Sequence, residues 1–483
     1  MAEENFGIKI GKKAFLSSFF ILLGLIVFAG ILTLAVPTGS YERQIVNGSE
    51  VFNWESFSFT QEDKLPVYRW VTAPLEVLGT SDGVKALALI ILLLIIGGSF
   101  AVIDKANVLK SIVSSIVKKF RNKRYFLIAI ITFIFMGFGS VLGIFEEAVP
   151  LVPIIIALSY LMGWDALVGL GMSLLAITFG FSSAISNPFT IGLAQKLTDL
   201  PAFSGTWYRL IIFAVIYTVL VFFLVRYAKK IDKDAKKSLV YEEDLVERKK
   251  YSSADGFINE NFKDKKTVNA VRCFLIMIFL MLFVIVLGIF IPQVSDMALI
   301  LMALLYLIAG ICTGFLAGMG VLNTFKVFAK GMAGISASAV LILMGISVKH
   351  IIVSGNIMDT LLYYAAQPLS GASPYSAVII IYMIVLCSNF FIGSASAKAF
   401  LLIPLLVPFA QMVGLSNQIM ITAWAFGDGF SNALYPTNPV LLICLGLSTV
   451  SYPKWFRWTF LLQLIVFIMT IGFSLFAVFI NYV

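Results

Sequence analysis

The sequence predicts an all-α polytopic membrane protein with two inverted repeats, each containing a re-entrant hairpin and a broken transmembrane helix. Of its 483 residues, 60% are hydrophobic and 13% are charged, whereas soluble domains are about half apolar and about a quarter charged. Apolar stretches long enough to cross a bilayer alternate with basic loops. Each half also contains an Asn-Pro pair inside an apolar stretch. These three observations together are typical of a secondary transporter.

The distribution of basic residues orients the spans and divides the chain. The basic tail around Lys9 is expected in the cytoplasm, and the acidic stretch before Arg69 is expected outside. The expected segments are an N-terminal span with an external loop (1–69), the first inverted repeat (70–227), a cytoplasmic linker (228–269), connecting spans (270–320) and the second inverted repeat (321–483). This order places the N-terminus inside and the C-terminus outside a bacterial cytoplasmic (inner) membrane.

Hydropathy predicts most of the individual spans directly. Ordinary crossings are expected near Ala14–Val36, Val84–Asp104, Gly205–Tyr227, Ala270–Ile291, Met297–Gly318 and Met332–Ser354, and a last span ends at Val483. The segment Lys105–Arg124 has apolar residues at helical spacing with lysines opposite them, so it predicts an amphipathic surface helix. Asn356–Pro368 is expected to lie along the outer surface.

Two segments are interpreted as re-entrant hairpins. If Tyr125–Gly163 began with an ordinary crossing, the basic segment Arg226–Lys237 would end outside, against the charge rule. A hairpin that enters and leaves on the cytoplasmic side, with its tip at Gly137–Pro150, removes this conflict. The second hairpin, Ser373–Val413, enters from outside and has its tip at Ser388–Lys398.

Each hairpin precedes an interrupted span, at Asp165–Leu197 and at Leu415–Leu447. Proline removes an amide donor and clashes with the preceding helical turn. A constant separation of 251 positions relates the halves through identical residues: Pro153 and Pro404, Gly163 and Gly414, Asn187 and Asn438, Pro188 and Pro439, and Trp207 and Trp458. This agreement supports an internal repeat.

The interrupted spans are candidate substrate sites, because an opened backbone offers carbonyl groups to a cation and helix N-termini to an anion. The candidate substrate-binding residues at the breaks are Ser186, Asn187, Pro188, Thr190, Asn432, Thr437 and Asn438. A simple proline kink with local repair by hydroxyl groups is the alternative interpretation of each break.

Four charged residues in apolar surroundings are further substrate-binding candidates, because an ionised group inside the membrane is costly unless it is paired or hydrated. Glu146 and Glu147 lie at the first hairpin tip, and Asp428 precedes the second break. Each of these acids could instead cap a helix. Lys398, which matches Glu147 after 251 positions, could pair with an acid or snorkel away.

Small and polar residues at the hairpin tips are candidates for binding a coupling ion or for forming the tips themselves. They are Ser140, Gly143, Asn389, Ser394 and Ser396. Helix packing is the alternative role for each serine. No metal site is expected, since the single histidine, His350, and four scattered cysteines have no metal-ligand spacing. No cofactor is expected apart from a sodium ion or a proton as coupling ion.

Charge suggests the class of substrate. Three candidate acids oppose one candidate lysine, an expected excess of two negative charges that favours cations. A carboxylate could still be held by Lys398 and by the half-helix ends, so a basic amino acid would fit both tendencies. The formal net charge of +9 does not indicate nucleic-acid binding, because the basic residues cluster in the loops.

Three stretches carry a family resemblance: "FEEAVPLVPIII" from Phe145, "ISNPFTIGLAQ" from Ile185 and "FGDGFSNALYPTNPVL" from Phe426. They resemble the YfcC-type, or four-carbon dicarboxylate anaerobic carrier-like, family of the ion transporter superfamily. The resemblance implies a homodimer with a scaffold part and a mobile transport part. It also implies carriers of several substrates, including arginine/ornithine antiporters and carriers of dicarboxylates or aminobenzoyl-glutamate. The stretch "YPTNP" at Tyr435–Pro439 departs from the threonine-serine-glycine type of sequence expected there.

We therefore expect a secondary active transporter that exchanges basic amino acids such as arginine and ornithine by alternating access. The alternative is a sodium- or proton-coupled symporter of dicarboxylates or other carboxylate or peptide-like solutes. A channel is disfavoured by the closed hairpin tips, and an enzyme by the lack of a nucleophile–base pair. The expected partners are the lipid bilayer, a small-molecule substrate and a second copy of the chain.

Overall fold

The computed structural model describes residues 12–46, 49–252, 264–291, 293–294, 297–369 and 371–483. Within these residues, nine helices are long and apolar enough to cross a membrane, so the chain is a multi-pass helical membrane protein, as predicted. The basic tail around Lys9 and the middle of the expected linker, 253–263, lie outside the described residues. Re-entry of the hairpins and the inverted arrangement of the repeats stay predictions.

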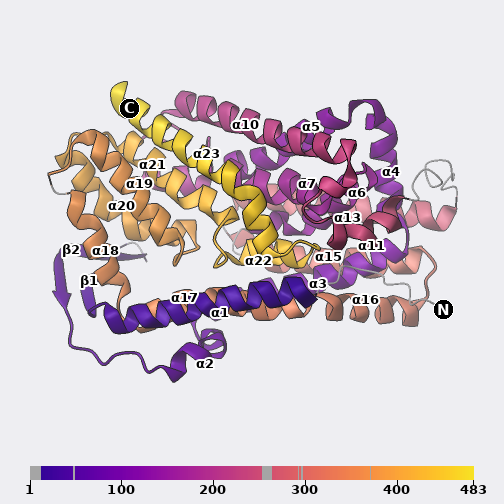
Figure 1. Ribbon diagram of the computed structural model, residues 1–483, viewed down its shortest axis with the longest axis horizontal. Helices are drawn as coiled ribbons and strands as arrows, with labels where there is room; N and C mark the ends of the chain where they lie inside the picture. Colours follow the sequence, from indigo (N-terminus) through magenta and orange to yellow (C-terminus); the bar gives the residue numbers. More distant parts are fainter. Residues whose placement is uncertain (1–11, 47–48, 253–263, 292, 295–296, 370) are drawn as a thin grey trace.

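One layer of the molecule consists of long helices, most of which run along the lower part of Figure 1. Its elements are α1 (Lys12–Ala35), α3 (Ser81–Lys105), α13 (Lys265–Phe290), α15 (Ala298–Leu316), α16 (Val321–Ile335) and α17 (Ala337–Ser354). Glycines bring α3 and α16 close together, because a Cβ atom at Gly331 would lie 2.4 Å from the carbonyl oxygen of Gly97. Small residues of this kind let helix backbones pack tightly in membranes.

A short antiparallel sheet stands at one end of this layer. Strands β1 (Gly39–Val46) and β2 (Ser49–Phe59) pair with each other, and α2 (Tyr68–Glu76) follows. The sheet rests on α18 (Met358–Ala366), where Phe57 stacks on Tyr363 with ring centroids 4.1 Å apart. The sequence predicted only an external loop here, so the sheet is an addition to the otherwise helical fold.

The second layer contains the two hairpins and the two broken helices. In the first half it comprises α5 (Arg124–Gly137), α6 (Val152–Leu161), α7 (Ala166–Leu170), α8 (Ala176–Ser182), α9 (Leu193–Leu197) and α10 (Thr206–Lys233). In the second half it comprises α19 (Pro374–Asn389), α20 (Ala395–Met412), α21 (Asn417–Gly429), α22 (Pro439–Gly446) and α23 (Tyr452–Phe479). Both spans are therefore interrupted at their Asn-Pro pairs, as the sequence predicted.

Local hydrogen bonds recur between the halves at the same separation. Asp165 caps α7 by accepting from the N–H of Val168, and Ser416 caps α21 by accepting from the N–H of Ile419. Each pair of equivalent residues is 251 positions apart. Gly163 follows the second helix of the first hairpin, and Gly414 follows the second helix of the second hairpin. Both glycines have a positive φ, of 86° and 76°. The backbone thus repeats the relation that the sequence identities indicated.

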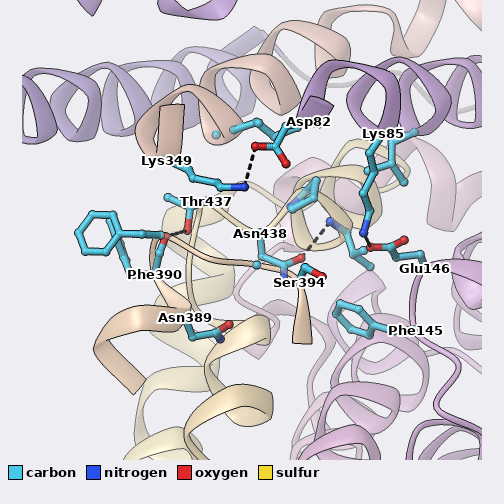
Figure 2. Close-up of a pocket in the computed structure, with 17 residues that line it drawn as sticks. Asp82, Lys85, Phe145, Glu146, Lys349, Asn389, Phe390, Ser394, Thr437 and Asn438 are labelled. Carbon is cyan, nitrogen blue, oxygen red and sulfur yellow. Dashed lines mark hydrogen bonds and ion pairs between the residues drawn. The ribbon is translucent and has the colours of Figure 1, made fainter. Parts of the chain in front are cut away.

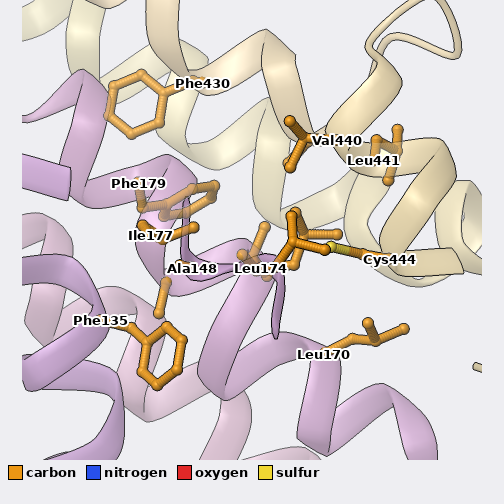
Figure 3. Close-up of a cluster of buried hydrophobic side chains, with 14 of the residues drawn as sticks. Phe135, Ala148, Leu170, Leu174, Ile177, Phe179, Phe430, Val440, Leu441 and Cys444 are labelled. Carbon is orange, nitrogen blue, oxygen red and sulfur yellow. The ribbon is translucent and has the colours of Figure 1, made fainter. Parts of the chain in front are cut away.

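The core of this layer joins the two halves. Figure 3 shows apolar side chains of the first half, including Leu174 and Phe179, beside those of the second half, including Phe430 and Val440. The chains cross closely at Ser182 and Gly429, where a Cβ on the glycine would lie 2.3 Å from the serine Cβ. Close packing of these side chains holds both broken helices against each other, since van der Waals contact drives helix association in membranes.

The expected linker is partly folded. Helix α10 continues to Lys233 and α13 starts at Lys265, so the regular helices extend into the interval 228–269. Between them, α11 (Tyr241–Ser252) packs on α6, and its Asp244 is fully buried. The predicted amphipathic helix is α4 (Val108–Phe120). A hydrophilic composition did not predict a buried acid in the linker, because the partners that bury it lie far away in the sequence.

Candidate substrate site

The first break is closed by the first hairpin tip. Ser140 accepts hydrogen bonds at its carbonyl oxygen from the N–H groups of Ile185 and Ser186, at 3.0 and 3.2 Å. Its hydroxyl donates to the carbonyl oxygen of Ser183 at 2.9 Å. Asn187 caps the next turn and donates to the carbonyl oxygen of Gly139 at 3.1 Å. The hairpin therefore satisfies backbone groups that the break releases.

The second break is held by the second hairpin in a different way. Thr437 donates from its hydroxyl to the carbonyl oxygen of Phe390 at 2.7 Å. Asn389 donates to Ser431 Oγ at 2.6 Å and to Asn432 Oδ1 at 3.0 Å, and Asn438 donates to the same Asn432 oxygen at 3.1 Å. These amides form one buried polar chain between the hairpin and the break.

The N-terminus of α22 has no free amide for an anion. Pro439 has no N–H group, and Asn438 Oδ1 accepts from the N–H groups of Val440 and Leu441 at 2.9 and 3.2 Å. The N–H of Leu442 bonds to the carbonyl oxygen of Asn438 at 3.2 Å. At this half-helix end the chain itself already occupies the donors that an anion would need.

A cavity of about 90 Å³ lies beside the second break (Figure 2). Its walls come from the second break, from both hairpin tips, and from α3 and α17 of the long-helix layer. The polar and charged residues that line it are Asp82, Lys85, Glu146, Lys349, Asn389, Ser394, Thr437 and Asn438. We call this cavity the break pocket. It is the structure's best candidate for a substrate site, because polar groups from several elements converge on one concave space.

Two ion pairs border the break pocket. Lys85 Nζ on α3 lies 2.7 Å from Glu146 Oε1 at the first hairpin tip, and Lys349 Nζ on α17 lies 2.6 Å from Asp82 Oδ2 on α3 (Figure 2). The side chains of these four residues are 20–47% exposed. Both pairs are thus reachable from the cavity, and each places a cation and an anion side by side.

A third ion pair is buried away from the cavity. Lys398 Nζ lies 2.6 Å from Asp428 Oδ1, with side chains 0% and 1% exposed. Of the two roles that the sequence left open for Lys398, pairing with an acid is the one observed. Neither residue lines the break pocket.

The structure gathers only part of the predicted set around the break pocket. Glu146, Asn389, Ser394, Thr437 and Asn438 line it. The other predicted residues do not: Ser140, Gly143, Ser186, Asn187, Pro188, Thr190 and Glu147 belong to the first hairpin and break, and Ser396, Lys398, Asp428 and Asn432 pack behind the second. The two breaks therefore differ, and only the second borders this pocket.

Asp82, Lys85 and Lys349 are pocket residues that sequence reasoning missed. They change the balance of charge in the pocket, since its two acids, Asp82 and Glu146, are matched by the two lysines and no excess is left. The expected excess of two negative charges counted Glu147, Asp428 and Lys398, which do not line this pocket. A signal was present: Lys85 and Lys349 both lie inside predicted spans, where an ionisable residue is a functional candidate by default.

A larger cavity of about 740 Å³ lies next to the break pocket, toward the β1–β2 sheet and α18. Its lining includes Glu62, His350 and Asp359. We call it the vestibule. Asp82 and Lys349 are the residues that line both cavities. Their ion pair therefore stands at the junction between vestibule and break pocket.

A polar pocket beside a broken helix in a helical membrane protein is typical of small-molecule transporters. The model of the DcuC family, "C4-dicarboxylate anaerobic carrier", matches residues 15–479. The chain is therefore a member of the C4-dicarboxylate anaerobic carrier family, and it is a membrane transporter.

Comparison with curated proteins gives two relatives. The putative basic amino acid antiporter YfcC of Escherichia coli is 28% identical over 409 residues, covering 83% of this chain and 79% of the relative. An uncharacterized protein of Haemophilus influenzae is 23% identical over 504 residues, covering 95% of each chain.

Two solved structures are similar across most of the chain. The Alcanivorax borkumensis YdaH transporter matches with a TM-score of 0.44 and 15% identity, covering 97% of this chain and 99% of that one. Neisseria gonorrhoeae MtrF matches with a TM-score of 0.42 and 15% identity, covering 95% and 94%.

Proposed function

We propose that this transporter exchanges basic amino acids, with arginine and ornithine as the first candidates, across a bacterial cytoplasmic membrane. The E. coli relative carries the name of a putative basic amino acid antiporter, which supports this class of substrate. The proposal includes a homodimer, alternating access, an internal N-terminus and an external C-terminus. It includes no enzymatic step.

One observation carries the choice of substrate: both lysines that line the break pocket are already paired with a carboxylate. A dicarboxylate would need two cationic partners, and it would meet two neutralised lysines and two carboxylates instead. The occupied N-terminus of α22 offers it no further help. Like charges placed side by side are strongly unfavourable in binding.

The charged groups of a basic amino acid can take the place of one partner in each of these ion pairs. Its α-carboxylate matches a lysine, and its α-ammonium and side-chain cation match Asp82 and Glu146. Such a substrate pairs with three of the four charged groups, and the second lysine shares Asp82 or Glu146 with a cationic group of the substrate. Substrate from the vestibule would reach the pocket past the pair of Asp82 and Lys349.

Counterflow in proteoliposomes tests the proposal. Vesicles loaded with ornithine should accumulate labelled arginine in sodium-free choline buffer with a protonophore, and empty vesicles should not. Vesicles loaded with succinate serve as the matched control and should give no arginine uptake. Absence of arginine counterflow from protein that is folded and monodisperse would contradict the proposal.

The second candidate function is a sodium- or proton-coupled symport of dicarboxylates, and the description of the family favours it. It predicts uptake of labelled succinate into empty vesicles when a sodium or proton gradient is applied. Gradient-driven succinate uptake without arginine exchange would establish this alternative.

A further inference from the structure

A lysine ammonium is enclosed between the second hairpin and the second broken helix. Lys398 on α20 is fully buried, and its Nζ lies 2.6 Å from Asp428 Oδ1 on α21. The same ammonium donates to the amide oxygen of Asn389 at the end of α19. Three helices thus supply the cation and the oxygen atoms that surround it.

The side chains around this ammonium present oxygen atoms to it. The amide nitrogen of Asn389 is used by Ser431 and Asn432, so its oxygen is directed to Lys398. Asp428 Oδ2 is buried and accepts no hydrogen bond from any group in the described part of the chain. Carboxylate and amide oxygens are the ligands that hard cations prefer. A buried carboxylate that stays ionised also requires a positive partner.

We propose that this is a cation site whose resident cation is the protein's own Lys398 ammonium, and that Na⁺ binds there once the ammonium is removed. The chain itself then supplies the positive charge opposite Asp428. If the carrier is an exchanger, as proposed above, no dissolved cation has to travel with the substrate at this position.

The first hairpin has no lysine at the position that matches Lys398. The residue 251 positions before Lys398 is Glu147, which accepts a hydrogen bond from the N–H of Phe145 at 3.2 Å. The matched positions therefore hold an acidic residue in the first half and a basic residue in the second. This asymmetry assigns the built-in cation to the second hairpin and break, beside the break pocket.

The test is the sodium dependence of thermal stability in the purified full-length chain. Melting temperatures are measured in NaCl and in choline chloride at equal ionic strength for the wild type, Lys398→Ala, the Lys398→Ala/Asp428→Ala double variant and Lys349→Ala. Lys349 is the matched control, because its ion pair with Asp82 is equally short but a third of its side chain is exposed.

We expect Lys398→Ala to gain a sodium-specific increase of about 2 °C or more over the wild type, since a ligand that binds the folded state stabilises it. The double variant and Lys349→Ala should not gain it. Equal melting temperatures of Lys398→Ala in the two salts would overturn the proposal. An equal gain in the double variant would also overturn it, because the sodium would then bind elsewhere.

Folding of the variant in NaCl but not in choline chloride would also support the site. If Lys398→Ala folds in neither salt, Lys398→Gln is measured in the same way, and no sodium-specific difference there would overturn the proposal. These measurements use no substrate. Their outcome is therefore independent of the arginine counterflow that tests the proposed function.

Discussion

Gly143 shows how a single residue controls the first hairpin tip. Its φ is +70°, and a Cβ there would lie 2.5 Å from Asn187 Oδ1, the oxygen that caps the next turn. A left-handed conformation costs an L-residue roughly 1–2 kcal/mol. We expect Gly143→Ala to lower the melting temperature by at least about 2 °C. Gly137→Ala is the control, because it has open space and a helical φ, and an equal loss there would contradict this explanation.

A substitution of Glu146 tests the role of the break pocket at the scale of a single residue. Its carboxylate pairs with Lys85 and lines the break pocket. We expect Glu146→Gln to reduce arginine counterflow at least about tenfold, the factor that corresponds to roughly 1.4 kcal/mol of lost interaction. Glu243→Gln is the matched control, since Glu243 makes a comparable 2.6 Å pair with Lys454 away from the pocket. Unchanged exchange in Glu146→Gln would remove Glu146 from substrate binding.

At the scale of elements, α11 ties the two halves together. Asp244 accepts hydrogen bonds from the N–H of Ala166 and the hydroxyl of Tyr160 in the first half, at 2.8 and 2.9 Å, and from Thr449 in the second. The surrounding charged groups are Asp165, Glu247, Arg248 and the exposed pair of Glu243 and Lys454. A helix of the hydrophilic linker thus connects the two halves, whose contacting residues are far apart in the sequence.

The burial of Asp244 should make the stability of the protein depend on pH. Burial, and then the nearby Asp165, raise the pKa of Asp244 to about 7, whereas an unfolded aspartate has a pKa of about 3.9. Between about pH 4 and 7 the folded chain therefore holds a proton that the unfolded chain lacks. This contribution is fully present below about pH 4 and is lost as the pH rises through about 7.

We expect Asp244→Asn to remove this pH dependence, which amounts to up to about 4 kcal/mol over the interval. Melting temperatures measured from pH 4 to pH 8 check it, and Glu243→Gln on the same helix should retain the wild-type slope. A variant Asp244→Asn with the wild-type slope would contradict the assignment of the titration to Asp244.

At the scale of the whole molecule, the ion pair of Asp82 and Lys349 lies at the junction of the vestibule and the break pocket. We expect its removal, in Asp82→Asn/Lys349→Gln, to speed the reaction of Ser394→Cys with a charged methanethiosulfonate several-fold. The background chain has its four native cysteines replaced. Ser394 lines the pocket, whereas Ser354 lines the vestibule, so Ser354→Cys should react at an unchanged rate. Equal rates at Ser394→Cys with and without the pair would show that the pair does not restrict access.

Much of this architecture is local and was predictable. Hydropathy is a property of consecutive residues, so it located the spans. The Asn-Pro pairs located both breaks, because proline prevents the same hydrogen bond wherever it interrupts a helix. The roles of Asn187 and Asn438 follow from their own neighbourhood, since each caps the turn that it starts.

The sequence by itself determined the membrane class and the two breaks, because each depends on residues close together in the chain. Only the tertiary structure decided which charges meet. Lys85 pairs with Glu146, Lys349 with Asp82, and Asp244 with groups of both halves. Most of these partners are far apart in the chain, and the packing of the helices alone brings them within hydrogen-bond distance.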